Sequence, residues 1–281
     1  MGVSTALYYF SGTGNTLVVA RDLAETLNGE LIPIAPLVSK ETIPVHTDIA
    51  GIVFPVYYGD APPIIREFAS KLDPAKLSYL FTLCTFGGGE GNSHRTVARI
   101  LRKRDIVPSA AFGVHMPQNA FSKPWENYPR IYKKWRRKRK AIAKYILERE
   151  SGSLVTDRLF RYLLLPINRL IASSNKKFLS GLAEMPPERS VVELHRGGDR
   201  SFYAVETCVG CGTCAEVCPV DNIEMIDNKP KWKHRCEQCL ACYNWCPEQA
   251  IRNKIAQKGY YYRNPDVTIT EIKKQNVYTG L

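Results

Sequence analysis

The same run of four cysteines occurs twice in this chain. Residues 208–218 read CVGCGTCAEVC and residues 236–246 read CEQCLACYNWC, and each run is followed by a proline, which gives the spacing C-x2-C-x2-C-x3-C-P. Three cysteines at i, i+3 and i+6 can hold three corners of a small cube, whereas structural zinc sites pair short C-x2-C knuckles and need four ligands in total. The doubled run therefore predicts two [4Fe–4S] clusters, and zinc is the alternative that the spacing disfavours.

The pairing of cysteines with clusters follows from the two-cluster pattern, in which the fourth cysteine of each run ligates the other cluster. This rule assigns Cys208, Cys211, Cys214 and Cys246 to cluster 1, and Cys236, Cys239, Cys242 and Cys218 to cluster 2. The repeat continues past the cysteines, because PVDNI at 219–223 is matched by PEQAI at 247–251. We expect Ile223 and Ile251 to pack over the cubes. The region resembles the bacterial two-cluster ferredoxin domain.

The N-terminal segment predicts an anion site. TALYYF at 5–10 is typical of a buried strand, and it runs through SGTGNT at 11–16 into an amphipathic helical stretch. Backbone N–H groups and hydroxyls converge at such a helix N-terminus, where the helix dipole favours negative charge. The loop lacks the lysine of a Walker A motif, and an uncharged hydroxyl loop suits a flavin monophosphate. The predicted phosphate-binding residues are Ser11, Gly12, Thr13, Gly14, Asn15 and Thr16. An ordinary strand-to-helix turn is the alternative.

Two further loops follow predicted strands at 49–54 and 78–84. In an open parallel sheet, ligands bind beyond the carboxyl ends of the strands at the topological switch point. The candidate flavin-flanking residues are Pro55, Val56, Tyr57, Tyr58 and Gly59 in the first loop, and Thr85, Phe86, Gly87 and Gly88 in the second. Either tyrosine could stack on a flat ring.

The three loops together resemble those of flavodoxin. Tyr58-Gly59-Asp60 is similar to the turn in which a flavodoxin peptide flips to accept a hydrogen bond from reduced flavin N5. With the cysteine runs, the chain resembles the family of fused flavodoxin–ferredoxin proteins of bacteria and archaea. The phrases that carry this likeness are YYFSGTGNT, FPVYYG, MPQN at 116–119 and CEQCLACYNWCP, and the likeness covers roughly 1–120 and 200–265. The resemblance implies FMN and two [4Fe–4S] clusters as cofactors.

The hydrophobic pattern predicts an α/β fold. Strands are expected near 4–10, 30–35, 49–54, 78–84 and 110–116, and helices near 15–27, 62–72, 92–104 and 127–149. This alternation predicts a doubly wound, five-stranded parallel sheet of order 2-1-3-4-5, with a crossover at 36–48 that is mostly loop. The expected domains are a flavodoxin-like FMN domain at 1–150, a helical connector at 151–200, a small α+β two-cluster ferredoxin domain at 201–255 and a tail at 256–281. The apolar segment 154–171 is expected to be a packed interdomain helix, with a membrane-surface anchor or an oligomer contact as alternatives.

Composition bounds the location and the partners. The net charge of +12 falls by about 4 with two clusters and by about 2 with a flavin phosphate, so the assembled protein remains basic. Eight cysteines in metal-binding spacing and the absence of signal-peptide features predict a cytoplasmic protein. The run RIYKKWRRKRK at 130–140 is interpreted as a helix with a solvated basic face, which could bind an acidic redox protein. Nucleic acid and anionic lipid are less favoured partners.

The predicted function is electron transfer between the clusters and FMN. A flavin-dependent reductase of a small acceptor such as a quinone is the main alternative, and a nucleic-acid-binding redox sensor is a weaker one. GGGEGN at 87–92 lacks the final glycine of a dinucleotide fingerprint, so no NAD(P)H site is expected. Cys84 is expected to be a buried strand residue rather than a redox thiol, and the five histidines show no ligand-like or triad-like companion in the sequence.

Overall fold

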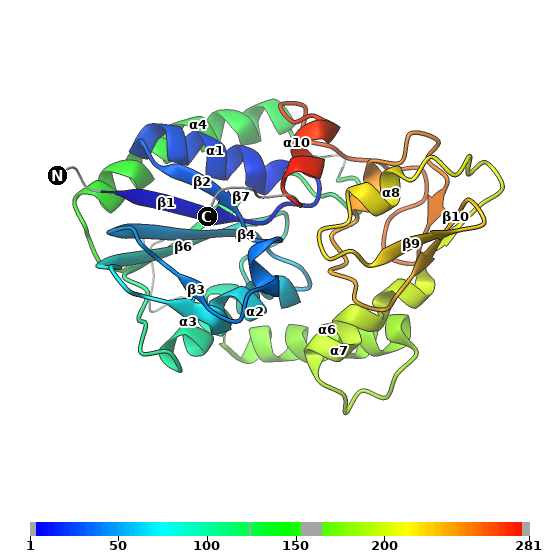
Figure 1. The fold of residues 1–281 in the computed structure, drawn as a ribbon, viewed down its shortest axis with the longest axis horizontal. Helices are drawn as coiled ribbons and strands as arrows, with labels where there is room; N and C mark the ends of the chain where they lie inside the picture. The colour runs from blue at the N-terminus through cyan, green and yellow to red at the C-terminus, as the bar shows by residue number, and fades with distance from the viewer. Residues whose placement is uncertain (1–3, 124, 153–164, 277–281) are drawn as a thin grey trace.

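The computed structural model describes residues 4–123, 125–152 and 165–276. Its larger half is a five-stranded sheet covered by helices on both faces (Figure 1). The strands are β1 (Thr5–Tyr9), β2 (Glu30–Pro33), β4 (Ile49–Pro55), β6 (Tyr79–Phe86) and β7 (Ala110–His115). Every neighbouring pair in the order β2-β1-β4-β6-β7 is parallel. The predicted doubly wound fold and its 2-1-3-4-5 order are confirmed.

Four helices form the outer layers of this half. The helices α1 (Asn15–Leu27) and α4 (Tyr128–Leu147) lie together over one face of the sheet, and α2 (Pro63–Lys71) and α3 (Ser93–Arg102) lie over the other (Figure 1). The second crossover holds only a 3-10 turn, η1 (Leu37–Ser39), and a short strand, β3 (Ile43–Pro44), which pairs with β5 (Leu72–Asp73). The expected loop character of 36–48 is therefore confirmed.

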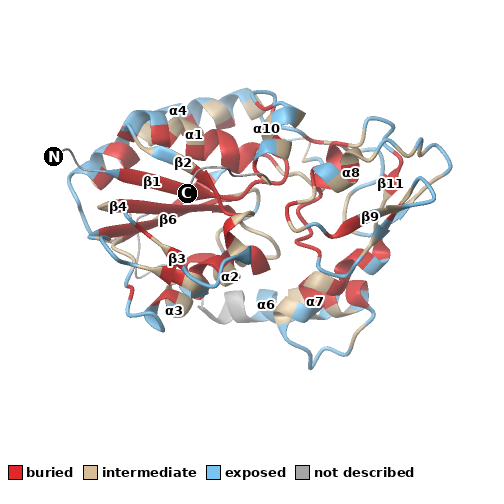
Figure 2. Ribbon diagram, viewed as in Figure 1, coloured by how far each residue is buried: buried red, intermediate tan, exposed pale blue. Residues whose placement is uncertain are grey.

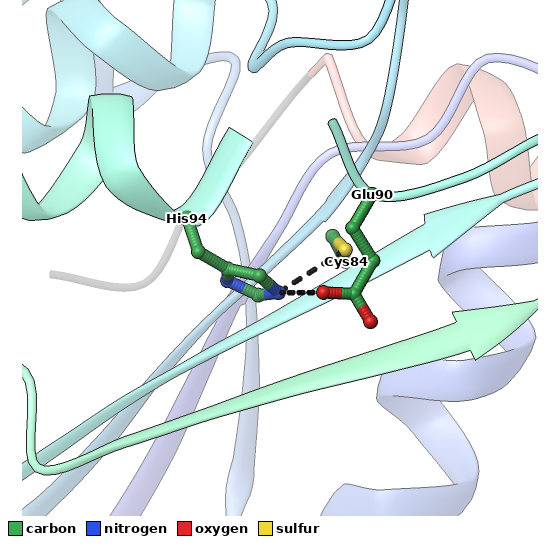
Figure 3. Close-up of side chains that lie close together, drawn as sticks. All are labelled: Cys84, Glu90 and His94. Carbon is green, nitrogen blue, oxygen red and sulfur yellow. Dashed lines mark hydrogen bonds and ion pairs between the residues drawn. The ribbon is translucent and has the colours of Figure 1, made fainter. Parts of the chain in front are cut away.

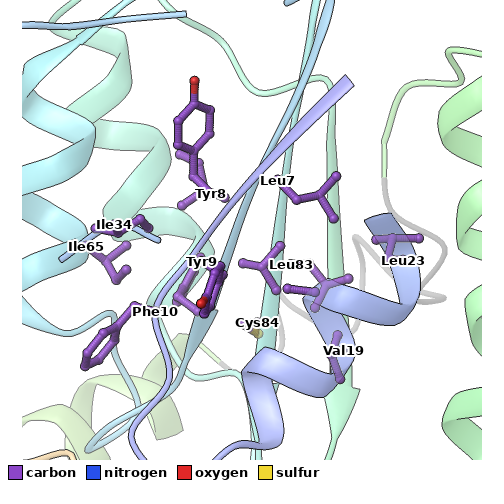
Figure 4. Packing of buried hydrophobic residues seen from close by; sticks show 14 of the residues in the cluster. Leu7, Tyr8, Tyr9, Phe10, Val19, Leu23, Ile34, Ile65, Leu83 and Cys84 are labelled. Carbon is purple, nitrogen blue, oxygen red and sulfur yellow. The ribbon is translucent and has the colours of Figure 1, made fainter. Parts of the chain in front are cut away.

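The core of this half explains why the central strands are almost wholly apolar. Each strand is buried between two helical layers, so both of its faces must be hydrophobic. Leu7 and Leu83 meet Val19 and Leu23 of α1 in this core (Figure 4), and all four side chains are fully buried. Figure 2 shows the result as a continuous buried sheet beneath helices whose outer faces are exposed. The sheet thereby becomes a rigid platform for the loops at its carboxyl edge.

The smaller half contains the two cysteine runs. Its elements are the antiparallel pairs β9 (Ile223–Ile226) with β10 (Lys229–Trp232) and β8 (Tyr203–Ala204) with β11 (Ile251–Arg252), and the short helices α8 (Thr213–Glu216) and α9 (Ala241–Asn244). Each short helix lies within one cysteine run, and the two helices contact each other. The internal repeat of the sequence thus becomes a structural repeat.

Two segments join the halves. The connector comprises α6 (Leu165–Ala183), α7 (Val191–Gly197) and the 3-10 turn η2 (Gly198–Ser201), which run below the two halves in Figure 1. Residues 154–164 of the predicted interdomain helix lie outside the described residues. The chain then returns from the smaller half to the larger one and ends in α10 (Ile269–Lys274), beside α1. No helix in the described part of the chain has the length and apolar character that crossing a bilayer requires.

Candidate functional site

The turn from β1 into α1 forms an anion cradle. Gly14 adopts a left-handed conformation, with φ 98°, and α1 begins at Asn15. The N–H groups of the first helical turn consequently have no intrahelical acceptor, and the positive end of the helix dipole lies there. Ser11, Thr13 and Thr16 are buried around this turn and place hydroxyl groups beside the N–H groups. The geometry suits a phosphate group.

A cavity opens above this turn at the carboxyl edge of the sheet. The three predicted loops all contribute to its wall. Its lining residues are Ser11, Gly12, Thr13, Asn15, Thr16, Pro55, Val56, Tyr57, Thr85, Phe86, Gly87, Met116, Pro117, Gln118 and Asn119. Of the residues predicted from sequence, Gly14, Tyr58, Gly59 and Gly88 do not line it. The wall combines the hydroxyl groups of Ser11, Thr13 and Thr16 with the rings of Tyr57 and Phe86, a combination that suits a flavin phosphate and a flavin ring.

The two candidate stacking tyrosines have different surroundings. Tyr57 lines the cavity, whereas the Tyr58 hydroxyl donates to Gln238 Oε1 at 2.5 Å and its ring lies edge-on to His195, with centroids 5.6 Å apart. The Tyr58 carbonyl accepts from Asn175 Nδ2 of α6 at 2.7 Å, and the Gly59 carbonyl accepts from the Asn92 N–H at 2.7 Å. Tyr57 is therefore the tyrosine in position to contact a flavin, and Tyr58 belongs to the contact with the smaller half.

A fourth loop lines the cavity and was not among the predicted site residues. It follows β7 and consists of residues 116–119, the MPQN phrase of the sequence. The Pro117 carbonyl accepts from Asn15 Nδ2 at 2.9 Å, which ties this loop to the start of α1. A side chain at Gly87 would place its Cβ 2.6 Å from Gln118 Cδ, so the second and fourth loops touch because Gly87 has no side chain. The sequence signal that could have identified this loop is its position directly after the fifth predicted strand, because ligands bind beyond the carboxyl ends of parallel strands.

The C-terminal tail forms hydrogen bonds with residues 11–16, the predicted phosphate loop. The Asn264 N–H donates to the Thr13 carbonyl at 2.9 Å, and the Tyr262 hydroxyl donates to Asn15 Oδ1 at 2.6 Å. Gln275 makes two bonds to Ser11, accepting from its N–H at 3.2 Å and donating to its carbonyl at 2.7 Å. These partners lie some 250 residues away in sequence, so no local pattern could have indicated them.

The eight cysteines of the two runs gather around two separate cavities. One is lined by Cys208, Cys211, Cys214 and Cys246, together with Ile251; the other is lined by Cys218, Cys236, Cys239 and Cys242, together with Ile223. Each cavity therefore takes three cysteines from one run and the fourth from the other run. This is the grouping that the crossed pattern predicts.

Burial raises the pKa of several of these thiols. Burial, and then the neighbouring thiolates of Cys246, Cys208 and Cys211, raise the pKa of Cys214 to about 11. Burial, and to a lesser extent the negative charge of Cys218, raise the pKa of Cys239 to about 12. Without a bound cation these groups are neutral thiols at pH 7, and iron would be needed to hold them as thiolates. The N–H groups of Asn222 and Ala250 donate to Cys218 Sγ and Cys246 Sγ at 3.2 and 3.3 Å, so the two fourth ligands have equivalent partners.

The second cysteine cavity lies against the phosphate loop. A Cβ added to Gly12 would lie 2.5 Å from the Cys239 carbonyl oxygen, so the two loops meet in direct backbone contact. Trp245 Nε1 donates to the Gly12 carbonyl at 3.0 Å, and Asn119 Nδ2 donates to the Cys239 carbonyl at 3.2 Å. The cavity at the carboxyl edge of the sheet and the second cysteine cavity are therefore neighbours.

The expectation that no histidine has a ligand-like companion is wrong for His94. His94 lies at the start of α3, where its Nε2 is 3.2 Å from Cys84 Sγ and 3.9 Å from Glu90 Oε2. Cys84 is fully buried, as expected for a strand residue. Its companions come from a loop and a helix that follow the strand, and the fold rather than the local sequence brings them to it.

Comparison with known proteins agrees with this organisation. Residues 207–251 match the family model of the 4Fe-4S dicluster domain. An uncharacterized polyferredoxin-like protein of Methanocaldococcus jannaschii is 38% identical over 65 residues, a match that covers 18% of this chain and 39% of that protein.

Similar solved structures include flavoproteins. A putative flavoprotein of Bacteroides uniformis (21% identity, 42% of this chain and 94% of that one, TM-score 0.33) is one of them. The flavodoxin of Megasphaera elsdenii (16% identity, 40% and 85%, TM-score 0.28) is another. The order of the parallel sheet establishes the flavodoxin-like fold of the larger half. A flavodoxin-like domain and a 4Fe-4S domain in one chain indicate a redox protein that transfers electrons.

Replacing the two fourth cysteines separately tests the crossed grouping. Cys218→Ala should damage the cluster whose other ligands are Cys236, Cys239 and Cys242, and Cys246→Ala should damage the other one, because each fourth ligand crosses over. Electron paramagnetic resonance and iron analysis of each reduced variant would check this. Loss of the cluster held by Cys208 and its neighbours in the Cys218 variant would contradict the grouping.

Adding a negative charge to the anion cradle tests the flavin site. Thr13→Asp should yield protein with near wild-type iron but little FMN, because the carboxylate would repel the phosphate dianion. Thr13→Val is the matched control for loss of the hydroxyl alone, and it should retain more FMN than the aspartate variant. Flavin and iron quantification would check both, and full FMN occupancy in Thr13→Asp would give the loop another role.

Proposed function

We propose that this chain, which joins a flavodoxin-like domain to a 4Fe-4S dicluster domain, carries low-potential electrons between two [4Fe–4S] clusters and FMN. When bound, the clusters exchange single electrons and FMN accepts one or two. The observation that supports this proposal best is the backbone contact between Gly12 of the phosphate loop and Cys239 of the second cysteine cavity. Two independent electron carriers would not require direct backbone contact between their cofactor loops.

A gradient of exposure supports an order of cofactors along the molecule. Cys236, Cys239 and Cys242 around the second cavity are all buried, whereas Cys211 of the first cavity is exposed. Val209, beside it, is 67% exposed, and it lines the first cavity. The first site therefore offers an edge to an external redox partner, while the second is shielded between the first site and the flavin site.

The residues between the sites favour transfer over solvent access. Trp245 and Asn119 close the junction with hydrogen bonds to the two loops, and the Trp245 ring is itself buried beneath the Arg263 guanidinium, 5.5 Å from its centroid. Burial of the junction keeps water away from the bound groups. A dry, rigid junction also limits the structural adjustment that accompanies each change of charge.

An acidic electron carrier is the partner that we propose for the basic helix α4. Ile131, Trp135, Ile142 and Ile146 are buried on one side of the helix, and the opposite side is exposed. Lys133, Lys134, Arg136, Arg137 and Lys140 form this exposed basic face. Lys138 does not belong to it, because its Nζ donates to the Gly113 carbonyl at 2.5 Å. Arg139 is paired with Asp22 at 3.4 Å.

Loss of the second cluster tests the proposed conduit. Reduced acidic ferredoxin should reduce FMN rapidly in the wild-type protein and far more slowly in Cys218→Ala, because the shielded site between entry and flavin is then incomplete. Cys246→Ala should slow the same reaction at the entry point. Anaerobic stopped-flow absorbance would measure the rates in variants that still contain FMN and one cluster, with direct dithionite reduction as the control. Equal flavin reduction rates in all three proteins would contradict the conduit.

Reversing the exposed charges of α4 tests the partner. Lys133→Glu, Lys134→Glu and Arg137→Glu together should slow electron exchange with an acidic ferredoxin on the order of tenfold at low salt, and the difference should shrink as salt is added. Arg95→Glu, Arg99→Glu and Arg102→Glu on α3 are the matched control, since these residues are also exposed and the change in net charge is identical. If both triple variants slow the rate equally, only net charge matters and α4 is not a docking face.

A further inference from the structure

Three side chains that could ligate a metal converge away from the cysteine runs. Cys84 lies on β6, Glu90 on the loop that follows β6, and His94 in the first turn of α3 (Figure 3). One ligand atom from each residue lies within 4.8 Å of the other two. Glu90 belongs to the loop of residues 85–91, part of which lines the cavity beside β1 and α1, but none of the three residues lines that cavity.

The geometry around the imidazole favours a cation at the point where the three groups meet. Nε2 of His94 carries either one hydrogen or one lone pair, yet it faces both the Cys84 sulfur at 3.2 Å and a Glu90 carboxylate oxygen at 3.9 Å (Figure 3). A thiol or thiolate and a carboxylate thus converge on one nitrogen. A metal ion placed among them would contact all three groups at once.

The second nitrogen of this imidazole is also positioned. His94 Nδ1 lies 2.8 Å from the hydroxyl of Thr82, which is itself buried. When Nδ1 donates its hydrogen to this hydroxyl, the lone pair of Nε2 is left facing Cys84 and Glu90. Metal-ligating histidines are characteristically held in this way by a partner on the other ring nitrogen.

We propose that Cys84, Glu90 and His94 bind a divalent transition-metal ion of the zinc type, separate from the iron–sulfur sites. One thiolate, one imidazole and one carboxylate are all established zinc ligands, and a water molecule can complete a tetrahedral set. Cys84 is fully buried and His94 nearly so, whereas Glu90 is only partly buried. Solvent, and hence the ion and the fourth ligand, would reach the site from the side of Glu90.

The ammonium group of Lys138 on α4 interacts with two members of this cluster, Glu90 and Cys84. Burial lowers its pKa, while Glu90 and Cys84 raise it, so its ammonium could itself balance their charge. Its Nζ donates one hydrogen to the Gly113 carbonyl at 2.5 Å, which leaves two N–H donors for the charges of Glu90 and Cys84. The two possibilities predict opposite results for metal content, so they can be separated experimentally.

The bound ion would brace the flavin-flanking loops. Glu90 precedes Gly91, and a side chain at Gly91 would overlap the Gly59 carbonyl, so the two loops touch there. The N–H of Asn92 donates to the same carbonyl at 2.7 Å. Fixing Glu90 to β6 and α3 would therefore fix the 85–91 loop and, through Gly59, the first flavin-flanking loop as well.

Zinc binding by the intact holoprotein tests this site. Protein purified anaerobically with full iron and FMN, incubated with zinc and dialysed, should retain about one zinc per chain. Zinc-edge X-ray absorption should show a single sulfur at about 2.3 Å, with the remaining ligands nitrogen or oxygen at about 2.0–2.2 Å. Thr82→Val should weaken zinc binding by about 10- to 100-fold, since it removes only the partner of the ligating histidine.

Variants identify the ligands and guard against misfolding. Glu90→Gln and His94→Gln should lose zinc while they keep iron. His115→Gln is the matched control, because His115 also lies 3.5 Å from a glutamate, Glu126, but does not belong to the group formed by Cys84, Glu90 and His94. Glu90→Gln changes a partly exposed loop residue, so it reports on the site even if a core variant fails to fold. Absence of zinc from the wild type, zinc bound by four sulfurs, or equal zinc in wild type and Glu90→Gln would overturn the proposal.

Discussion

The close approach of Gly12 to Cys239 is the constraint on which the arrangement of the two halves depends. Any side chain at position 12 would overlap the backbone of the second cysteine run, with its Cβ 2.5 Å from the Cys239 carbonyl. The absence of a side chain lets two loops that each need exposed backbone N–H groups for their own cofactor pack directly together. Trp245 and Asn119 then satisfy the carbonyls left at the junction, since buried backbone groups without partners are costly.

Polar groups add to the apolar contacts at this junction, where Val217, Ala241 and Trp245 of the smaller half belong to the same buried cluster as the core of the larger half. The Glu237 carboxylate, from the second cysteine run, accepts from the Ile64 N–H at the start of α2 at 3.0 Å, and burial raises its pKa to about 8. Gln238 accepts from the Tyr58 hydroxyl and donates to the His195 carbonyl, which joins both halves to the connector. Such networks specify one relative orientation, because any shift leaves buried polar groups without partners.

The tail completes the phosphate loop from the far end of the chain. A glycine- and hydroxyl-rich turn has many backbone groups and few side chains with which to satisfy them. Gln275 and Asn264 supply those partners for Ser11 and Thr13, and α10 begins with a capping box between Thr268 and Glu271 that fixes its start. None of the described tail residues lines the cavity, so the tail supports the loop at 11–16 without filling the cavity.

Local patterns were enough to predict the sheet and its strand order, and they predicted the grouping of cysteines found around the two cavities. These features depend on spacings of two, three or four residues, which the sequence states directly. They also indicated three of the four loops around the cavity. Only the tertiary structure decided that Tyr57 rather than Tyr58 faces the cavity, because that choice depends on Gln238, His195 and Asn175 from distant segments. The meeting of Cys84 with His94, and of Gly12 with Cys239, was likewise decided by packing, since contacts between elements leave no periodic trace in the sequence.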